Sequence, residues 1–295
     1  MFISDFLHYI EFERRYSKHT LISYTKDLEQ FSEFLRETYQ VEKANEVDFV
    51  FIRSWIATLM EEGKSPRTVN RKISTLKSYF RYLLKVGKIE DNPVLKISGP
   101  KARKKLPVFI EEKSMNLLIT EFKTPESFEE ARDRLVVELF YATGIRRAEL
   151  IGLKSSDVNL DSKLIKVLGK RNKERLIPIH NSIFSLIDSY LGFKENALTE
   201  QSQDPYFFLT VKGKKMYPKL VYRIVNNYLS KVSTQKKKSP HVLRHTFATH
   251  MLNHGADLNA VKELLGHANL AATQIYTHNT IEKLKNIYKL AHPKA

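Results

Sequence analysis

Apolar residues recur every three or four positions through the first hundred residues, a spacing that predicts amphipathic helices. Ser17, Asp48 and Ser65 stand where helix caps are expected, and Pro66 suits a first helical turn. The predicted helices are Phe2–Phe12, Thr20–Arg36, Asp48–Met60 and Pro66–Leu84. Short helices joined by short loops favour a compact bundle.

The apolar residues of Asn92–Pro107 follow neither the helical period nor the two-residue period of a strand. The stretch holds three prolines, one glycine and a basic cluster. Such a composition is typical of a linker between domains. We therefore predict a helical domain over residues 1–91, a basic linker over residues 92–107 and a second domain over residues 108–295.

The second domain is predicted to be mostly helical around one small antiparallel sheet. Period-two alternation over Lys163–Leu168 and Glu174–Ile179 indicates a β-hairpin with Lys170 at its tip. The predicted helices are Glu111–Phe122, Ser127–Thr143, Arg147–Leu153, Ser182–Leu191, Pro218–Lys231, Pro240–His254, Leu258–Leu265 and Ile281–Leu290. The fold class is therefore mainly α.

The charge balance points to a class of partner. The chain has 49 Lys and Arg against 33 Asp and Glu, a formal charge of +16, which favours a polyanion over a small neutral substrate. From Lys64 to Lys105 there are 13 basic residues against two acids, an excess that predicts a surface following DNA phosphates. The candidate DNA-binding residues are Arg67, Arg71, Lys72, Lys77, Arg103, Lys104 and Lys105.

The absence of cysteine from the sequence excludes disulfides, thiolate catalysis and Cys-based zinc sites. The first fifteen residues include Asp5 and Glu11 and lack the basic start and apolar core of a signal peptide. No apolar run approaches the roughly 20 residues of a membrane span. We expect a cytoplasmic, nucleoid-associated protein without a membrane partner.

Candidate chemistry begins at Ser239-Pro240, a helix start after which His241 and Arg244 lie three residues apart on one face. The positive end of the helix dipole is near, which makes this a phosphate site. No acid occurs from Pro205 to Ala256, so the region is poorly suited to holding a metal ion. A surface His/Arg pair is the structural alternative.

Four further residues could complete such a site. His267 follows Gly266, a predicted helix end, and Tyr276 lies nine residues beyond His267. Arg146 follows the glycine-terminated helix that ends near residue 143, with Glu149 close enough to orient it. Taken singly, each has a structural alternative: a helix-end histidine, one of 14 tyrosines, an exposed ion pair or a turn lysine at Lys170.

In chain order, the set resembles the R…K…HxxR…H…Y catalytic residues of the tyrosine recombinase (phage-integrase) family: Arg146, Lys170, His241, Arg244, His267 and Tyr276. The resemblance extends through ATGIRRAEL, GKRNKERLIPI, SPHVLRHTFATHMLNHGADL, LLGHANLAATQIYTH and HPKA, and through the N-terminal SKHTLISYTKDLEQFSEFL and SPRTVNRKISTLKSYFRYLL. It covers essentially the whole chain and is greatest to the bacterial XerC/XerD recombinases, with a slight lean to XerD. One departure is Arg171, where relatives usually have the second glycine of GKGNK.

The resemblance implies a SAM-like, four-helix core-binding domain followed by a catalytic domain. It implies that Tyr276 attacks DNA and forms a 3′-phosphotyrosyl bond, with His241 as base and Lys170 as acid for the 5′ oxygen. Arg146, Arg244 and His267 would bind the phosphate oxygens. No metal, ATP or other cofactor is implied.

The implied partner is a double-stranded DNA recombination site. Four subunits, identical or paired with a paralogous recombinase, would exchange strands on two sites through a Holliday junction, with each C-terminal segment from residue 281 onward packing onto a neighbour. A DNA translocase is a further expected partner. The expected role is Xer-type resolution of chromosome or plasmid dimers.

Several alternatives stay open. Integration of a mobile element would use the same residues, and so would a type IB topoisomerase, although the basic N-terminal helices disfavour the latter. A non-catalytic DNA-binding protein would have no use for an intact nucleophile. A metallohydrolase could use His241 with His245, or His250 with His254, but such pairs usually have a carboxylate nearby.

Overall fold

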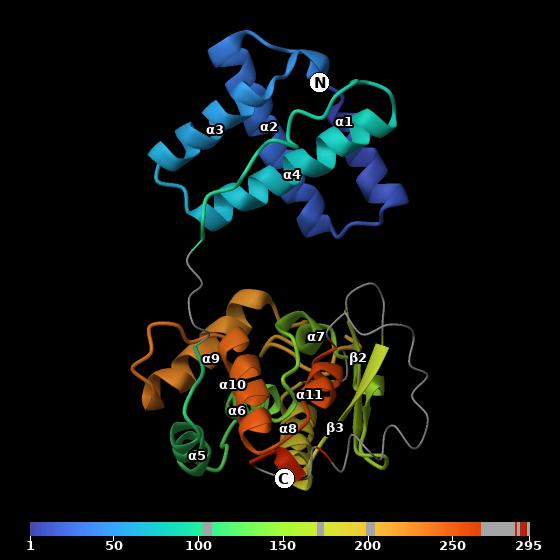
Figure 1. Cartoon of the computed structure of the whole chain (residues 1–295). Coiled ribbons are helices and arrows are strands. Elements are labelled where there is room, and N and C mark those ends of the chain that lie inside the picture. The colour runs from blue at the N-terminus through green and yellow to red at the C-terminus, as the bar shows by residue number, and fades with distance from the viewer. Residues whose placement is uncertain (103–107, 170–173, 199–203, 267–286, 288–289, 294–295) are drawn as a thin grey trace. The chain divides into compact units, whose positions relative to one another are not determined.

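The computed structural model describes residues 1–102, 108–169, 174–198, 204–266, 287 and 290–293. The chain divides into two compact units, Met1–Lys105 and Leu106–Ala295 (Figure 1). The division falls inside the stretch 92–107. Within the described ranges, no helix combines the length and the apolar character that crossing a membrane requires.

The N-terminal unit is a helical bundle. Helix α1 (Ile3–His8) continues into a π-helical turn (Tyr9–Glu13), and α2 (Lys18–Tyr39), a short 3-10 turn (Ala44–Glu46), α3 (Phe49–Glu61) and α4 (Pro66–Lys85) follow. Ser17, Asp48 and Ser65 accept hydrogen bonds from first-turn amides, so the expected caps are present. Trp55 and Phe31 pack in the core between these helices, with ring centroids 4.9 Å apart.

The C-terminal unit is built around α6 (Phe128–Thr143), which is buried on nearly all sides. It packs against α8 (Asn181–Ala197), α9 (Pro218–Val232) and α10 (Pro240–Asn253). Helices α5 (Glu112–Thr120), α7 (Arg147–Gly152) and α11 (Leu258–Leu265) lie around this centre (Figure 1). Because α6 is surrounded by other elements, its apolar residues cover most of its circumference rather than one stripe.

A small antiparallel sheet completes this unit. Its strands are β1 (Val158–Asn159), β2 (Leu164–Leu168) and β3 (Glu174–Pro178), in the order β1-β2-β3. Leu164 pairs with Pro178 and Leu168 with Glu174, so β2 and β3 form the predicted hairpin. The mainly helical fold with one small sheet is thus confirmed.

Three differences from the predicted elements stand out. Strand β1, two residues long, was not predicted. Helix α8 extends six residues beyond the expected Leu191, and Lys194 in this extension donates to the carbonyl of Phe207, 3.1 Å away. The predicted helix Ile281–Leu290 lies mostly outside the described residues. The two of its residues that are described, Ile287 and Leu290, are helical.

Candidate active site

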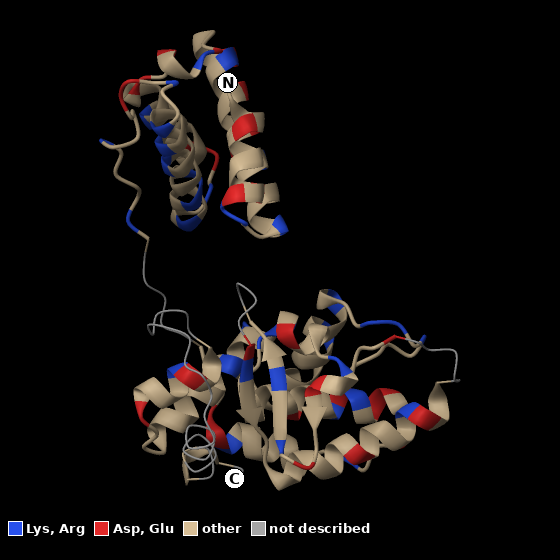
Figure 2. Cartoon of the chain, turned by 90° about the vertical axis from the view of Figure 1, so that its right-hand side faces the viewer, with Lys and Arg blue, Asp and Glu red and all other residues tan. Residues whose placement is uncertain are grey.

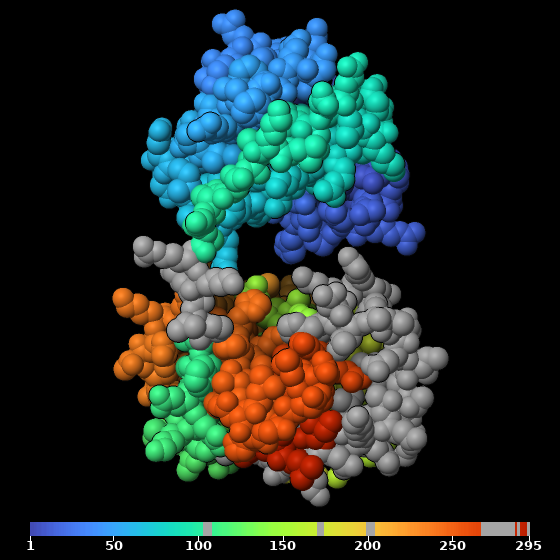
Figure 3. All heavy atoms as spheres, viewed as in Figure 1, coloured from blue at the N-terminus to red at the C-terminus, as the bar shows by residue number. Residues whose placement is uncertain are grey.

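The C-terminal ends of α6 and α11 meet the middle of α10 closely in the C-terminal unit. Helix α6 ends at Gly144, which has a left-handed φ of 58°. A Cβ atom there would lie 2.5 Å from Phe247 of α10 and 2.7 Å from Leu265 of α11, so only glycine allows this approach. Helices α10 and α11 lie side by side at the surface of the unit (Figure 3). This packing brings Arg146, just past the end of α6, next to Arg244 of α10.

Three consecutive carbonyl groups at the C-terminal end of α11 bind three different arginines. Arg175 Nε donates to Leu264 O at 2.9 Å, and Arg244 Nη2 donates to Leu265 O at 2.6 Å. Arg146 Nη2 donates to Gly266 O at 2.7 Å. The last carbonyls of a helix have no partner within it and lie at the negative end of its dipole. The end of α11 therefore fixes the guanidinium groups of Arg146 and Arg244 near one another.

Concentrated positive charge is the main electrostatic feature of this site. Arg244 also donates to Gly144 O at 2.5 Å, and burial, followed by the charges of Arg146 and Arg175, lowers its pKa to about 10. A depressed pKa of a cation means that the folded protein holds this charge at a cost. An anion bound at the site would offset that cost, so the site is suited to phosphate.

A buried carboxylate orients the arginines. Glu149 accepts from the amide of Arg146 at 2.8 Å and from Arg146 Nη1 at 2.7 Å. Arg175 donates both terminal nitrogens to the two oxygens of Glu149, at 2.7 and 2.8 Å. Burial by itself would raise the pKa of Glu149, but the bonds and charges of Arg175 and then Arg146 hold it below its usual value. Glu149 therefore stays ionised as an anchor between two cations.

The described residues contain three of the six expected catalytic side chains. Arg146 and Arg244 lie together, and His241 is exposed on α10, one turn before Arg244. Lys170, His267 and Tyr276 lie outside the described residues. Gly266, the left-handed C-cap of α11, is followed directly in the chain by His267.

Arg175 was missed by the sequence analysis. It lies in β3 on the same face as the buried Ile177, two residues away, and its side chain is buried. In a strand, residues two apart share a face. The signal that could have revealed Arg175 was therefore a charged residue at a strand position whose side chain faces the core.

Of the expected DNA-binding residues on α4, three are exposed and one is not. Arg67, Arg71 and Lys77 are exposed, and Arg71 also pairs with Asp27. Blue Lys and Arg positions are spread along α4 in Figure 2. Lys72 is buried, and its ammonium lies 3.0 Å from the carboxylate of Asp27. The expectation that Lys72 contacts DNA is therefore wrong for this structure, because its charge is neutralised inside the bundle. Arg103, Lys104 and Lys105 lie outside the described residues.

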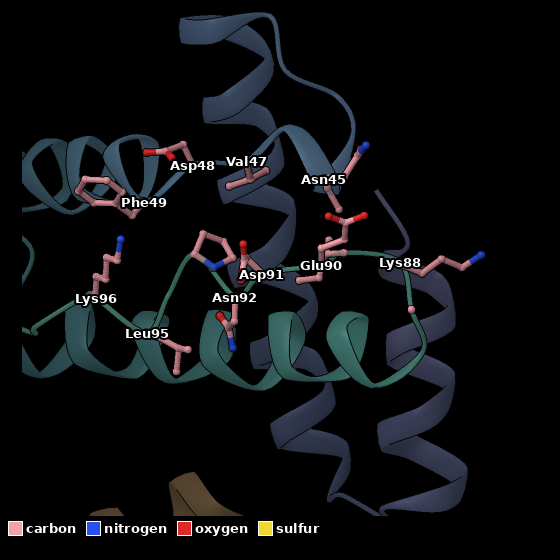
Figure 4. A pocket seen from close by; sticks show the side chains of 14 residues that line it. Asn45, Val47, Asp48, Phe49, Lys88, Glu90, Asp91, Asn92, Leu95 and Lys96 are labelled. Carbon is pink, nitrogen blue, oxygen red and sulfur yellow. The ribbon is translucent and has the colours of Figure 1, made fainter.

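A polar cleft of about 740 Å³ lies in the N-terminal unit, between the start of α3 and the segment after α4 (Figure 4). Asp48, Glu90 and Asp91 line it together with Lys88 and Lys96. Among the residues described, its lining includes no side chain expected to bind DNA or to catalyse. Mixed charges of this kind do not mark it as a phosphate site.

Two of the four histidines of the metal-site alternative, His250 and His254, have other partners. His250 Nδ1 and the Tyr141 hydroxyl share a hydrogen bond of 3.0 Å, and His254 Nε2 pairs with Glu112 at 3.0 Å. No group of three His, Cys, Asp or Glu suited to a metal ion occurs in the parts of the chain that the structure describes.

Comparison with known families accounts for both units. The phage integrase family model matches residues 108–283, which include all six expected catalytic residues. The model of the phage integrase N-terminal SAM-like domain matches residues 3–87. The chain belongs to the phage integrase family of tyrosine recombinases. The predicted family, fold class and activity, site-specific cutting and rejoining of DNA, are thereby confirmed.

Curated members of this tyrosine recombinase family match along almost the full length. The tyrosine recombinase XerC of Chlorobaculum tepidum is 38% identical over 317 residues, covering 99% of this chain and 94% of that protein. The tyrosine recombinase XerD of Listeria monocytogenes is 36% identical over 294 residues, covering 99% of each. Because both names occur among the relatives, the lean to XerD stays a prediction.

Solved structures of tyrosine recombinases share the fold. The XerH site-specific recombinase bound to its palindromic difH substrate, in a post-cleavage complex, gives a TM-score of 0.71 at 24% identity, covering 90% of this chain and 78% of that one. The Tn1549 transposon integrase in complex with circular intermediate DNA gives 0.69 at 18% identity, covering 95% and 97%. At these identities the likeness concerns the fold alone.

Proposed function

We propose that this recombinase is of the Xer type and resolves dimers of a chromosome or plasmid. The DNA-cleaving part of the proposal is carried by the convergence of Arg146 and Arg244 on the C-terminal end of α11, directly before His267 in the chain. The near-complete match to XerC and XerD proteins supports the assignment to this branch.

In the proposed reaction, Arg146 and Arg244 bind the non-bridging oxygens of the scissile phosphate. Each guanidinium can present paired donors to such oxygens, and these bonds strengthen as negative charge builds in the transition state. Donors fixed by carbonyl groups and by Glu149 do not have to be reorganised during the reaction. His267 adds a further donor to the same oxygens.

Tyr276 is the proposed nucleophile. Its phenolic oxygen bonds to phosphorus, the bond from phosphorus to the 5′ oxygen breaks, and the DNA 3′ end stays attached through a phosphotyrosyl ester. His241 takes the phenolic proton and Lys170 gives a proton to the leaving 5′ oxygen. The ester conserves the energy of the broken bond, so attack by the 5′-hydroxyl of a second duplex restores a phosphodiester.

The basic surface of the N-terminal unit is proposed to hold the DNA backbone. Arg67, Arg71 and Lys77 are exposed on one helix, and the basic stretch Arg103–Lys105 follows in the linker. Contacts of this kind give affinity and register without reading the bases. Arg71 and Lys72 both pair with Asp27, but Lys72 is left out of this set because it is buried.

Four subunits on two DNA sites are proposed to act together, alone or with a paralogous recombinase and a translocase. In the single chain, Ala291 and His292 are buried, and His292 Nε2 donates to Tyr141 O at 3.3 Å. Ile287 also packs against this unit's own core, so packing onto a neighbouring subunit is proposed for the part of the C-terminal segment that precedes Ile287.

Genome-wide capture of DNA covalently bound to the protein tests the dimer-resolution role. We expect one dominant chromosomal or plasmid site in wild-type cells, no capture in a Tyr276→Phe strain, and accumulation of replicon dimers when the gene is deleted. Capture only at the two ends of a mobile element, without dimer accumulation, would assign the chain to integration instead.

A further inference from the structure

Arg175 connects three segments of the C-terminal unit. It lies on β3, it binds Glu149 of α7 through both terminal nitrogens, and its Nε binds the carbonyl of Leu264 in α11. The side chain is 4% exposed. Bidentate carboxylate binding and a third bond in the same plane make full use of the guanidinium fork.

We propose that Arg175 is a positioning residue for DNA cleavage, which holds Glu149 and the end of α11 so that Arg146 and Arg244 face one phosphate. The inference rests on the proposed roles of Arg146 and Arg244. Arg175 itself is buried and reaches the reacting atoms only through other residues.

The contacts of Glu149 explain why a second arginine is needed. Arg175 spans both oxygens of Glu149, while Arg146 uses one side-chain nitrogen, Nη1, on Oε1. Without Arg175, a two-pronged pair between Arg146 and Glu149 becomes favourable, because such forks are the strongest carboxylate contacts. Arg146 would then turn its donors to Glu149 and away from the phosphate.

The second function of Arg175 is to fix the end of α11. A Cβ atom at Gly266 would lie 3.1 Å from both Cδ and Nη1 of Arg175, so the two residues pack without spare space. Leu264, Leu265 and Gly266 then present their carbonyls in a fixed order to Arg175, Arg244 and Arg146. Loss of the first contact frees the helix end that holds the other two.

Lysine cannot replace this arginine. An ammonium group carries the same charge, but it is a point charge without the planar fork that reaches both oxygens of Glu149 and Leu264 O together. Arg175→Lys therefore keeps the charge of the site and removes its geometry.

A matched control lies in the same unit. Arg132 is also buried, forms ion pairs with Glu129 and Asp133, and donates to a backbone carbonyl, Leu209 O, at 3.4 Å. None of these partners binds Arg146 or Arg244 among the described residues. Arg132→Lys should therefore reproduce the loss of stability of Arg175→Lys without its effect on cleavage.

The test measures single-turnover cleavage of a nicked recombination site by the full-length protein, with thermal unfolding and DNA affinity measured in parallel. We expect Arg175→Lys to cleave roughly 10²-fold more slowly, as misplacement of catalytic groups by about 1 Å can do. DNA affinity and its salt dependence should match wild type, because Arg175 contacts no phosphate. Arg132→Lys should cleave at the wild-type rate.

A double-mutant cycle shows whether Arg175 acts through Arg146. In an Arg146→Ala background, Arg175→Lys should slow cleavage much less than it does in wild type, because the residue being positioned is already absent. Arg132→Lys should remain without effect in both backgrounds. If Arg175→Lys does not fold, Arg175→Gln, which leaves no buried cation, is measured in the same way.

Equal cleavage by Arg175→Lys, Arg132→Lys and wild type would overturn the inference and leave the proposed function intact. Equal slowing by Arg175→Lys with and without Arg146 would also overturn it. Failure of the wild-type protein to cleave any recombination site would instead refute the proposed function on which the inference rests.

Discussion

At the scale of single residues, the site depends on charged side chains that are fixed inside the protein. Arg244 is held by two carbonyls from different segments, Gly144 O and Leu265 O, and Arg146 is held by Glu149 and Gly266 O. These contacts bring two cations together before any phosphate is present. Their repulsion lowers the pKa of Arg244 further than burial alone would.

Replacing Arg244 by lysine should nearly abolish cleavage. One ammonium cannot span the two carbonyls and also offer paired donors to a phosphate. Loss of one such donor typically costs about 10²–10³-fold in rate. The measurement is single-turnover cleavage, with Arg147→Lys, an exposed neighbour of Arg146, as the control. Cleavage by Arg244→Lys at the wild-type rate would contradict this role.

Replacing Lys72 should affect stability, whereas replacing Lys77 should affect DNA binding, although both are lysines of α4. Lys72→Met removes one partner of the buried carboxylate of Asp27, which keeps Arg71 and Thr75, and should cost about 1–3 kcal/mol. Trp55, the single tryptophan, lies in the core of this unit, so its fluorescence reports the unfolding. Lys77→Met should leave stability unchanged and lower the salt slope of DNA binding by about one ion. Equal stability of the two variants would refute the buried pair.

At the scale of elements, the site is the place where α6 ends and α10, α11 and β3 meet. Gly144 allows the approach of α10 and α11, and Gly266 ends α11 against Arg175. A hydrogen bond of 3.0 Å between Tyr141 and His250 also joins α6 to α10. The active-site arginines thus depend on close packing between elements.

Gly144→Ala should destabilise the C-terminal unit. A left-handed backbone costs a residue with a Cβ about 1–2 kcal/mol, and the clash with Phe247 and Leu265 should add about 1–3 kcal/mol. Gly152→Ala is the control, because a Cβ there meets nothing within 4 Å, and it should cause no loss. Thermal unfolding compares the two, and similar melting temperatures would contradict the packing described.

Acid should weaken the link between α6 and α10. Burial, and further the charge of His254, lowers the pKa of His250 from its usual 6.5, although Glu112 opposes this shift. Below pH 6.5 the unfolded chain therefore binds a proton that the folded chain takes up less readily, and stability decreases as the pH is lowered. His250→Gln cannot titrate, so its free energy of unfolding should change less between pH 7 and pH 5. An identical pH dependence in both proteins would exclude this contribution.

Features that depend on neighbouring residues could be predicted from the sequence, and features that depend on distant residues could not. Local periodicity and caps placed α4, α10 and α11 within one residue at each end, because amphipathic stripes and proline or glycine signals are local. Arg146 and Arg244 could be predicted from motif spacing. The partners of Arg175 and Lys72 could not, because Glu149 and Asp27 lie 26 and 45 residues away in the chain. Only the tertiary fold decides whether such a charge faces inward.

At the scale of the whole molecule, the excess positive charge is divided between two tasks. Exposed lysines and arginines of α4 are available to a DNA backbone, whereas Arg146, Arg175 and Arg244 of the C-terminal unit are fixed around one small site. DNA affinity should therefore fall steeply with salt, and cleavage of already bound DNA should respond less. Binding and cleavage rates measured from low to high salt test this separation; a flat binding curve would contradict it.

The central claim is that Tyr276 attacks a phosphate held by Arg146 and Arg244. The most direct measurement uses a nicked half-site, in which the short 5′-hydroxyl strand diffuses away and traps the intermediate. With wild-type protein, in EDTA and without ATP, we expect a denaturation-resistant complex whose peptide map places the DNA 3′ phosphate on Tyr276. Tyr276→Phe should bind the same DNA and form no such complex. A covalent complex with Tyr276→Phe, or DNA attached to another residue in wild type, would contradict the account.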